Sequence, residues 1–324
     1  MIYPDVYYLP NWGKLNEKLE KGIYDEFIYD TDLGQIVYPF VKRKTPTDID
    51  DNLYYDLITP YGFNGPCITK CNGDKLKLLT DYEEKFKLYC EQNKIIAEYI
   101  RFSPWLKNAQ DFKNLYSLQD NNITFFIDLK NEDYFEKIYS SKCRNQIRKA
   151  IKSGVEVKLY FGIEKLEEFY DLYCKMLQKN DVSDYYKFQK DYIQNTIEMM
   201  QGNIVTAVAF YEDIPISASL FLYNDKYIHY HLSGNNKDYS NYCGNHLVLY
   251  EVSKWAFEKG IEEFHLGGVA NDEKGLYHFK ESFARDGILP FFVGKKIDND
   301  IIYNKLVKKL NKSVGSGYFP AYRG

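Results

Sequence analysis

Apolar residues follow strand-like and helix-like patterns along the first half of the chain. Residues 24–44 contain two apolar and β-branched runs on either side of a turn at 30–34, which predicts a β-hairpin. Residues 53–66 and 98–105 predict two further extended segments. Residues 74–93 carry apolar side chains at helical spacing, which predicts an amphipathic helix. Its predicted apolar stripe consists of Leu76, Leu79, Tyr82, Phe86 and Tyr89.

The second half of the chain repeats this order of elements. Its predicted helices are 132–153, two within 163–200, and 245–259, and its predicted strands are 155–161, 204–211, 214–223, 226–233 and 262–266. Each half then has a helix with a meander of strands, followed by a second helix and a last strand. This order predicts an α/β (α+β) chain with two similar modules, a duplication that is invisible as sequence identity.

The composition is that of a globular protein and limits the classes of partner. The 324 residues are 45% hydrophobic and 27% charged, and their number suggests about two domains. Because 42 basic residues face 46 acidic ones, for a net charge of −4, we expect no general coating of nucleic acid and no DNA partner. A local basic groove stays compatible with this balance. The 32 tyrosines are suited to half-wet surfaces and clefts, since each ring has a polar tip.

Membrane and export signals are not visible in the sequence. No run of eighteen apolar residues occurs, so we expect no integral membrane association, while peripheral contact stays open. The N-terminal residues show no basic region followed by an apolar stretch, so we expect no secretory signal. The cysteines are scattered, which predicts reduced thiols and a cytoplasmic location. They are Cys67, Cys71, Cys90, Cys143, Cys174 and Cys243.

A basic cluster occupies residues 142–152, which contain no acidic side chain. Its members are Lys142, Arg144, Arg148, Lys149 and Lys152. At 3.6 residues per turn, Arg144, Arg148 and Lys152 share one helical face. Such a face could hold a phosphate-bearing ligand or a nucleic acid backbone. The alternative is a solvated helix face that is balanced by the acidic residues just before it, Glu132, Asp133 and Glu136.

The segment 262–283 combines a predicted strand, two glycines and an aromatic helix. Gly267 and Gly268 let the backbone turn sharply and let another group approach closely. Aromatic residues and Lys280 then recur at helical spacing. A lysine among aromatic rings would be partly desolvated, and its ammonium could stabilise a developing oxyanion. The alternative is a lysine whose stem lies along an amphipathic helix while its charge stays in water.

Histidines and phosphate-binding loops offer weaker candidates. His229 and His231 alternate on a predicted strand, so a metal pair is geometrically conceivable, but spacing places no third ligand. We therefore predict no metal. The sequence has no GxxxxGK[ST], GxGxxG or GxSxG motif. Residues 241–245, between a strand and a helix, could present backbone N–H groups to a pyrophosphate, although they contain a single glycine.

Three segments together resemble the FemABX-like aminoacyltransferases, a group of GNAT-fold acyltransferases. They are SSKCRNQIRKAIKSGVEV (140–157), LSGNNKDYSNYCGNHLVLYEVSKWAF (232–257) and FHLGGVANDEKGLYHFKESF (264–283). The resemblance covers most of the chain and is best over 123–296. It implies two tandem GNAT-like domains, each a mixed, mostly antiparallel sheet flanked by helices. It also implies that the C-terminus returns to the first domain, so we expect domains at 1–122 plus 300–324 and at 123–299.

The resemblance also implies a function and a set of site residues. The family transfers an amino acid from aminoacyl-tRNA to an amine on a peptidoglycan precursor, without a cofactor, whereas relatives use acyl-CoA. Phe279 and Lys280 match the family's catalytic Phe-Lys pair, and Tyr230 matches a tyrosine that lines the same channel. The implied partners are therefore a tRNA and a cell-envelope precursor. The sequence does not indicate an oligomeric state.

The chain departs from the family where better-known members grip the diphosphate of a nucleotide-sugar precursor. In place of an arginine after the first long helix of the second domain, it offers Tyr185, Tyr186 and Lys187. Near the N-terminus, Trp12-Gly13-Lys14 matches only loosely. Three functions stay open: an aminoacyl-tRNA-dependent transferase, an acyl-CoA-dependent N-acyltransferase acting on a sugar or peptide amine, and a non-catalytic module that binds an envelope precursor.

Overall fold

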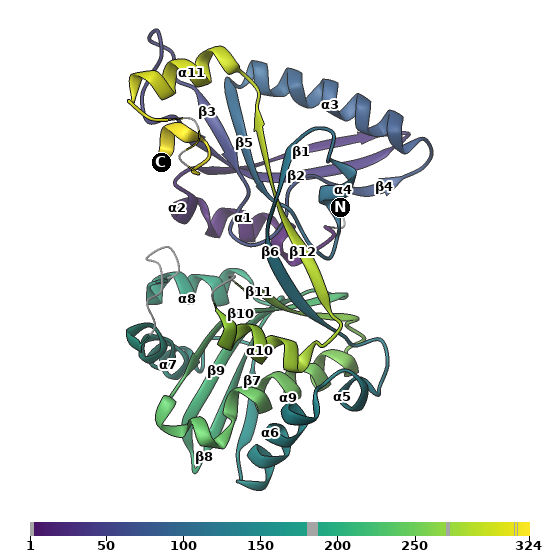
Figure 1. Ribbon diagram of the computed structural model, residues 1–324, viewed down its shortest axis with the longest axis vertical. Helices are drawn as coiled ribbons and strands as arrows, with labels where there is room; N and C mark the ends of the chain where they lie inside the picture. Colours follow the sequence, from purple (N-terminus) through teal and green to yellow (C-terminus); the bar gives the residue numbers. More distant parts are fainter. Residues whose placement is uncertain (1–2, 180–186, 270–272, 314, 316) are drawn as a thin grey trace. The chain divides into compact units, whose positions relative to one another are not determined.

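The computed structural model describes residues 3–179, 187–269, 273–313, 315 and 317–324 (Figure 1). The chain divides into a first unit, Met1–Asn121 with Pro290–Gly324, and a second unit, Asn122–Leu289. Each unit has a mixed sheet flanked by helices, so the predicted fold class is confirmed. Within the described residues, no helix combines the length and the apolar character that crossing a membrane requires.

The first unit is built around a sheet in the order β1-β2-β3-β5-β12. β4 pairs with the first residues of β2, Gly34 to Val37, and β3 pairs with its last residues. Only the β3–β5 pair among these is parallel. The strands are β1 (Ile23–Thr31), β2 (Gly34–Lys44), β3 (Tyr55–Ile58), β4 (Cys67–Cys71), β5 (Ile95–Arg101) and β12 (Ile288–Ile297). The helices are η1 (Val6–Tyr8), α1 (Pro10–Leu15), α2 (Glu17–Glu20), α3 (Lys75–Gln92), α4 (Asn108–Asp111), α11 (Asp300–Lys309) and η4 (Ala321–Arg323).

The predicted hairpin is confirmed and forms the base of this sheet. Thr31 pairs with Gly34 across the turn, and the register continues to Ile23 opposite Lys42. The middle of β2 is buried on both faces: β1, β3 and β4 pair along its edges, while α1, α2 and α3 contact its side chains. The run of apolar residues in β2 is therefore continuous and not alternating, as expected for a doubly covered strand.

Helix α3 covers one face of this sheet (Figure 1). Its N-cap is Asp74, whose side chain accepts hydrogen bonds from the backbone N–H groups of Leu76 and Lys77. The buried residues of α3 are Leu78, Tyr82, Phe86 and Cys90. Tyr82 and Phe86 were predicted correctly, but Leu76 is 75% exposed. Leu76 lies six residues before Tyr82, so it points about 120° away around the helix.

The C-terminal segment packs on the opposite face through α11 and η4. Asp56 on β3 is 0% exposed, and it accepts hydrogen bonds from Tyr322 (3.0 Å), Arg323 (2.6 Å) and Arg43 (2.7 Å). Two guanidinium groups thus neutralise one buried carboxylate. Because two of the three donors belong to η4, this cluster fixes the end of the chain to the sheet.

The second unit has the strand order β6-β11-β10-β9-β8-β7, in which only β10 and β11 are parallel neighbours. Its strands are β6 (Ser117–Asp128), which enters from the first unit, β7 (Glu156–Tyr160), β8 (Ile204–Tyr211), β9 (Ile214–Tyr223), β10 (Tyr227–Asn235) and β11 (Glu263–Val269). Its helices are α5 (Tyr134–Lys137), α6 (Ser141–Lys152), α7 (Leu166–Lys179), α8 (Lys190–Met199), η3 (Lys237–Tyr242), α9 (Gly244–Glu258) and α10 (Lys274–Phe283).

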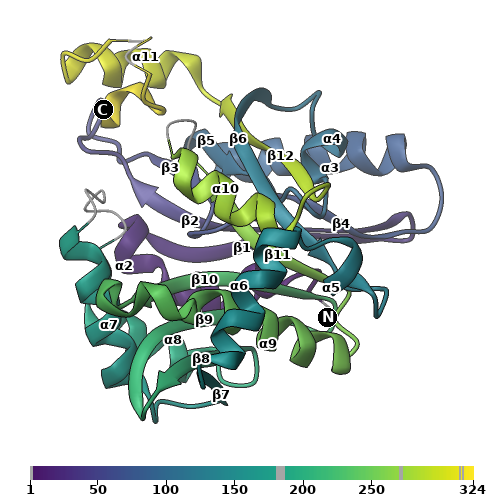
Figure 2. The ribbon, with the colours of Figure 1, turned by 60° about the horizontal axis from the view of Figure 1, so that its bottom comes forward.

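Helices cover both faces of this second sheet (Figure 2). Helices α6, α9 and α10 bury Ile147, Val248 and Phe283 in one core with the strands. Helix α7 approaches β10 so closely that a Cβ on Gly234 would lie 2.3 Å from the backbone nitrogen of Tyr173. Glycine is therefore needed at position 234.

Several predicted boundaries were wrong. The helix predicted over 132–153 is two helices, because Ser140 caps α6 by accepting a hydrogen bond from the N–H of Cys143. The strand predicted over 98–105 is β5, which begins and ends earlier. Strands β4, β6 and β12 were not predicted. Residues 290–299 belong to the first unit, not the second, because β12 pairs with β5 from Val293 to Ile297.

We predict that Asp56→Ala destabilises the first unit by about 3–5 kcal/mol, because it leaves the buried guanidinium of Arg43 and the half-buried guanidinium of Arg323 without their counter-charge. Urea denaturation would measure the change in the free energy of unfolding, and limited proteolysis should cut earlier near the C-terminus. The matched control is Asp111→Ala, which removes a half-exposed pair with Lys75 and should cost less than about 1 kcal/mol. Equal stability of the two variants would contradict the role of Asp56.

Candidate functional site

The second sheet opens between its two parallel strands. β10 and β11 pair only from Tyr227–Glu263 to His229–His265, although β10 continues to Asn235 and β11 to Val269. Beyond the last pair, β10 follows β9 and β11 follows β6. Each strand has a bulge at this point, between Tyr230 and Leu232 and between His265 and Gly267. Bulges bend strands and re-aim side chains, so the two strands separate here.

Lys280 lies at this opening. It comes from α10, and its Nζ donates a hydrogen bond to the backbone oxygen of Gly268 at 2.7 Å. Gly267 has a φ of +78°, and a Cβ there would lie 3.5 Å from the Lys280 Nζ and 3.9 Å from the oxygen of Tyr230. Any other residue at 267 would therefore be strained and would reach into the space before the ammonium. The predicted site residues Gly267, Gly268 and Lys280 thus come together.

Burial changes the acidity of this lysine. Lys280 is 6% exposed. Desolvation lowers its pKa to about 8, and the nearby charge of Glu273 opposes part of that effect. At neutral pH the side chain still carries its proton in most molecules. It is therefore a cation held in a low-dielectric place with one backbone acceptor, and its remaining N–H donors can serve a reacting group.

Tyr230 connects the opening to the start of α9. Its ring stacks on Phe221 at 5.5 Å between centroids, and its hydroxyl donates to Asn245 Oδ1 at 3.2 Å. Burial raises the pKa of Tyr230, while its hydrogen bond with Asn245 and the nearby hydroxyls of Ser233 and Ser219 act in the opposite direction. Its hydroxyl therefore stays protonated, and together with Asn245 it forms a polar pair next to the opening between β10 and β11.

Phe279 packs beside the same helix end. Its ring meets that of His246 edge to face, at 5.1 Å between centroids, and it also contacts Phe283. Burial lowers the pKa of His246 to about 4, and the charge of Lys142 adds to this effect. His246 is therefore neutral at pH 7. Sequence reasoning did not select Asn245 or His246 for this place, because only the fold brings the first turn of α9 to the aromatic face of α10.

The predicted basic face of α6 is partly occupied by an acid. Arg144 and Arg148 both pair with Glu136, at 3.3 and 3.2 Å, and Arg144 also donates to the backbone oxygens of Glu136 and Tyr139. The solvated and balanced alternative therefore describes these two arginines. Glu136 can reach them because the helix is interrupted before Ser140, so that α5 lies beside α6 and not in line with it.

The other flank of α6 faces the start of α9. Cys243, which precedes α9 with a φ of +56°, donates its S–H to Gln146. The charge of Lys149 lowers the pKa of the same thiol against the larger, opposite effect of burial. Lys142, Gln146 and Lys149 are spaced by four and three residues and share a face. Lys142, Lys149 and Lys152 are exposed.

The remaining predicted residues lie elsewhere. Tyr185 and Tyr186 fall outside the described residues, and Lys187 is exposed shortly before α8. His229 stacks on His265 at 5.2 Å between ring centroids, and Phe126 stacks on His265 in turn. His231 occupies the bulge of β10, and burial lowers its pKa to about 3. His231 is therefore neutral at pH 7, and the rings of His229 and His265 pack in the sheet.

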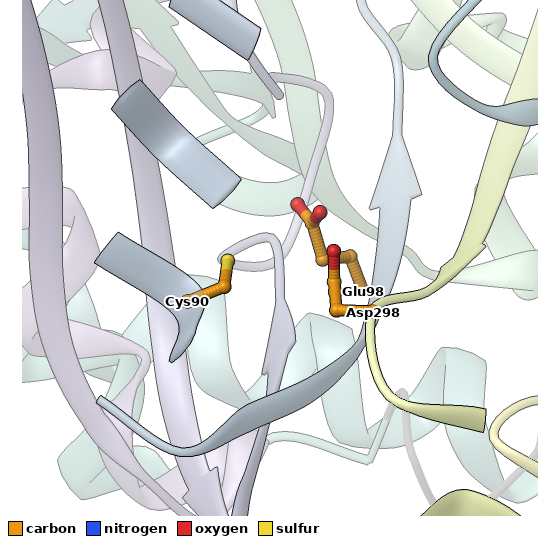
Figure 3. A group of neighbouring side chains, drawn as sticks. All are labelled: Cys90, Glu98 and Asp298. Carbon is orange, nitrogen blue, oxygen red and sulfur yellow. The ribbon is translucent and has the colours of Figure 1, made fainter. Parts of the chain in front are cut away.

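A different group has ligand atoms close enough for a metal ion. Among the described residues, Cys90, Glu98 and Asp298 place one such atom each within 4.8 Å of one another (Figure 3). The Nζ of Lys296 lies 3.3 Å from Glu98 and 3.1 Å from Asp298, so an ammonium already supplies positive charge there. Burial raises the pKa of the Cys90 thiol, which opposes the thiolate that a metal needs. We interpret this group as a buried ion-pair cluster.

The arrangement around Lys280 suits one kind of chemistry. A desolvated ammonium beside a strand opening can stabilise negative charge that develops on a carbonyl oxygen. On the strand side, Gly267 and Gly268 leave room for a substrate, and the hydroxyl of Tyr230 offers it a polar partner. The cations Lys142 and Lys149 lie toward the start of α9, where a negatively charged substrate group would also meet the positive end of a helix dipole.

Comparison with known proteins agrees with this description of the second unit. Residues 141–281 match the acetyltransferase (GNAT) domain family. The chain is 25% identical over 180 residues to the UDP-N-acetylmuramoylpentapeptide-lysine N(6)-alanyltransferase of Weissella viridescens, covering 53% of this chain and 51% of that protein. It is also 25% identical over 243 residues to aminoacyltransferase FemA of Staphylococcus epidermidis, covering 71% of this chain and 46% of FemA. The chain thus spans about half the length of these relatives.

A solved structure extends the similarity to both units. The crystal structure of FemX superimposes with a TM-score of 0.69 at 14% identity, and the match covers 92% of this chain and 93% of that one. At such identity the likeness concerns the fold. It includes the first unit, for which the sequence resemblance was looser.

We predict that Lys280→Met stabilises the protein at pH 7 by up to roughly 3 kcal/mol, since a pKa shift from 10.5 to about 8 has that worth. Below pH 8 the lysine is charged in both states, and the folded state bears the whole desolvation cost. The advantage of the variant should therefore shrink as the pH rises from 8 to 10.5. Chemical denaturation at several pH values measures it.

The control for this experiment is Lys274→Met, at an exposed position at the start of α10, which should leave stability unchanged at every pH. If Lys280→Met were less stable than the wild type at pH 7 and more stable at pH 10, the assigned direction would be wrong.

A second pH effect is expected in the first unit. Burial is the main cause that raises the pKa of Glu98 to about 7, with Asp298 adding to it and Lys296 opposing it. The folded state therefore binds a proton more tightly than the unfolded state, and stability should decrease as the pH rises from about 4.5 to 7. Glu98→Gln mimics the protonated form, so its melting temperature should gain on that of the wild type over this range. If the melting temperatures of the two proteins changed in parallel between pH 4.5 and 7, the raised pKa of Glu98 would be refuted.

Proposed function

Because the chain belongs to the FemABX-like family of GNAT-fold aminoacyltransferases, we propose that it transfers an aminoacyl group from an aminoacyl-tRNA to an amine on a cell-wall precursor. The observation that carries this proposal is the desolvated ammonium of Lys280 at the opening between β10 and β11. The reaction would take place in the cytoplasm, where aminoacyl-tRNA is available, and would need no cofactor besides the donor.

The reaction has a simple balance. The neutral acceptor amine attacks the ester carbonyl of the donor and forms a C–N bond. The tetrahedral intermediate carries its negative charge on the former carbonyl oxygen. When the intermediate collapses, the C–O bond to the terminal ribose breaks, and the proton lost by the amine goes to the released ribose oxygen. The products are an amide and a free tRNA.

Lys280 would act on the intermediate. Its Nζ keeps one hydrogen bond to Gly268, so its orientation is set before the substrate arrives. An oriented donor in a low-dielectric site stabilises an oxyanion better than water does, because it needs no reorganisation. Phe279 and His246 would shield the same place from water through their edge-to-face contact. Tyr230 and Asn245 would orient the substrate groups through their shared hydrogen bond.

The electrostatics favour a donor with phosphates at the start of α9. Lys142 and Lys149 lie on this side, whereas Arg144 and Arg148 are engaged by Glu136. The proposed donor contact therefore uses the lysines, and the arginines would take part only if a ligand replaced Glu136. The acceptor is inferred from the relatives, one of which is a UDP-N-acetylmuramoylpentapeptide-lysine N(6)-alanyltransferase.

We predict that Lys280→Ala lowers the rate of aminoacyl transfer by about two orders of magnitude, the usual effect of losing one oxyanion donor. The assay measures transfer of a radiolabelled amino acid from tRNA to a muramoyl pentapeptide. Lys274→Ala is the matched control on the same helix and should keep full activity. A folded Lys280→Ala protein with unchanged turnover would remove Lys280 from the mechanism.

Thermal shifts separate this function from the acyl-CoA alternative and from a binding module. A ligand at one hundred times its Kd adds about 2.7 kcal/mol of stability. Stabilisation by tRNA and precursor, but not by acetyl-CoA, is expected. Stabilisation by acetyl-CoA alone would favour an acyl-CoA-dependent N-acyltransferase. Binding of the precursor without any transfer would favour the binding module.

A further inference from the structure

Three tyrosine rings gather where the chain approaches α9. Tyr211 ends β8, and Tyr239 and Tyr242 belong to η3, the short helix before α9. The Tyr211 and Tyr242 ring centroids are 4.0 Å apart with a 34° angle between planes, and Tyr239 lies 6.3 Å from Tyr211 and 6.0 Å from Tyr242. All three rings are half-buried, so each rests on the core and keeps part of its surface in solvent.

This cluster directly adjoins the cationic flank of α6. Cys243 follows Tyr242 and donates to Gln146 of α6, and Lys149 lies three residues after Gln146 on the same face of that helix. Lys142 and Lys149 are exposed and lie on the flank opposite to the arginines that Glu136 engages. Lys237, also exposed, begins η3. An aromatic surface thus stands beside lysines that are available to an anion.

Aromatic rings next to cations are the combination that proteins use for nucleotides. Bases stack on tyrosine with little dependence on sequence, and lysines take the phosphates. An apolar partner without charge would use the rings but leave the lysines unmatched. A phosphate alone would use the lysines but leave the rings unmatched. Only a ligand with both a planar base and a phosphate uses the whole surface.

We propose that Tyr211, Tyr239 and Tyr242, with Lys149, form a binding site for the terminal nucleotide of the acyl donor. The inference rests on the proposed function and deepens it by assigning the part of the donor that is bound. Tyr242 precedes Asn245 by three residues, so their Cα atoms are at most about 11 Å apart. Asn245 in turn holds Tyr230 at the strand opening.

This closeness favours a nucleotide whose own ribose carries the ester. In an aminoacylated 3′ end, the base and the reactive carbonyl are attached to the same sugar. In an acyl-coenzyme, a long arm separates the base from the thioester. Both ligands contain adenosine and phosphate, so the experiment must compare them directly.

The test is isothermal titration of the full chain with three probes. They are the trinucleotide CCA, which ends every tRNA, adenosine without phosphate, and acetyl-CoA. The variant Tyr242→Ala should weaken CCA binding about tenfold, the usual effect of losing one stacked base. Tyr242→Phe keeps the ring and is the matched control, so it should bind CCA as the wild type does. Equal CCA affinity of wild type and Tyr242→Ala would overturn the proposal.

A lysine variant provides an independent test in case the Tyr242→Ala protein does not fold. Lys149→Gln changes an exposed side chain, and it should weaken CCA binding while leaving adenosine binding unchanged. Lys175→Gln, on the exposed side of α7, is its control and should alter neither. If Lys149→Gln changed nothing, or if Tyr242→Ala weakened acetyl-CoA binding and not CCA binding, the assignment to the nucleic acid donor would be wrong.

The two proposals fail in distinguishable ways. If the wild type binds CCA through Tyr242 but transfers no amino acid, the proposed function fails and the nucleotide site stands. If it transfers amino acids and Tyr242→Ala changes neither the KM for aminoacyl-tRNA nor CCA binding, the nucleotide site fails alone. In the expected case, Tyr242→Ala raises the KM for the donor and leaves kcat near its wild-type value.

Discussion

The separation of β10 from β11 is the constraint on which the second unit depends. Each strand has an antiparallel partner on its outer side, and the parallel pairing between them covers only three residue pairs before both strands bulge. The chain leaves β10 through η3 into α9, and it leaves β11 toward α10. The opening therefore lies beside both helices, and it receives Asn245 from the first turn of α9 and Lys280 from the last turn of α10. Gly267 keeps the space before Lys280 clear.

Two lysines with little exposed surface show how neighbouring groups decide the pKa of an ammonium. Lys280 has a backbone oxygen for an acceptor, and the charge of Glu273 offsets only part of the desolvation, so its pKa decreases. Lys296 is also buried, but it lies within 3.3 Å of two carboxylates, and its pKa increases. The first arrangement costs stability and leaves donors for a ligand, whereas the second satisfies its charge inside the fold. A charged group whose pKa is shifted by desolvation is typical of functional sites.

The candidate site could be predicted in part. Lys280 was selected from the aromatic spacing of its helix and from the family resemblance, and the structure brings it together with Gly267 and Gly268. The basic cluster was predicted as one face of a helix, but Arg144 and Arg148 are neutralised by Glu136 while Lys142 and Lys149 face the start of α9. Helical spacing alone cannot distinguish these flanks, because the difference lies in the neighbouring elements and not in the helix.

The local elements and the type of fold follow from short-range patterns in the sequence. The hairpin of β1 and β2, the helix α3 and the strands β8 to β10 follow from periodicity and turn residues, which act over a few neighbouring positions. Three other features depend on tertiary packing: which charges are paired, the place of β12 in the first unit, and the contact of Tyr211 with Tyr239 and Tyr242. These contacts join residues far apart in the chain. Their formation depends on how strands and helices pack, and no local pattern records it.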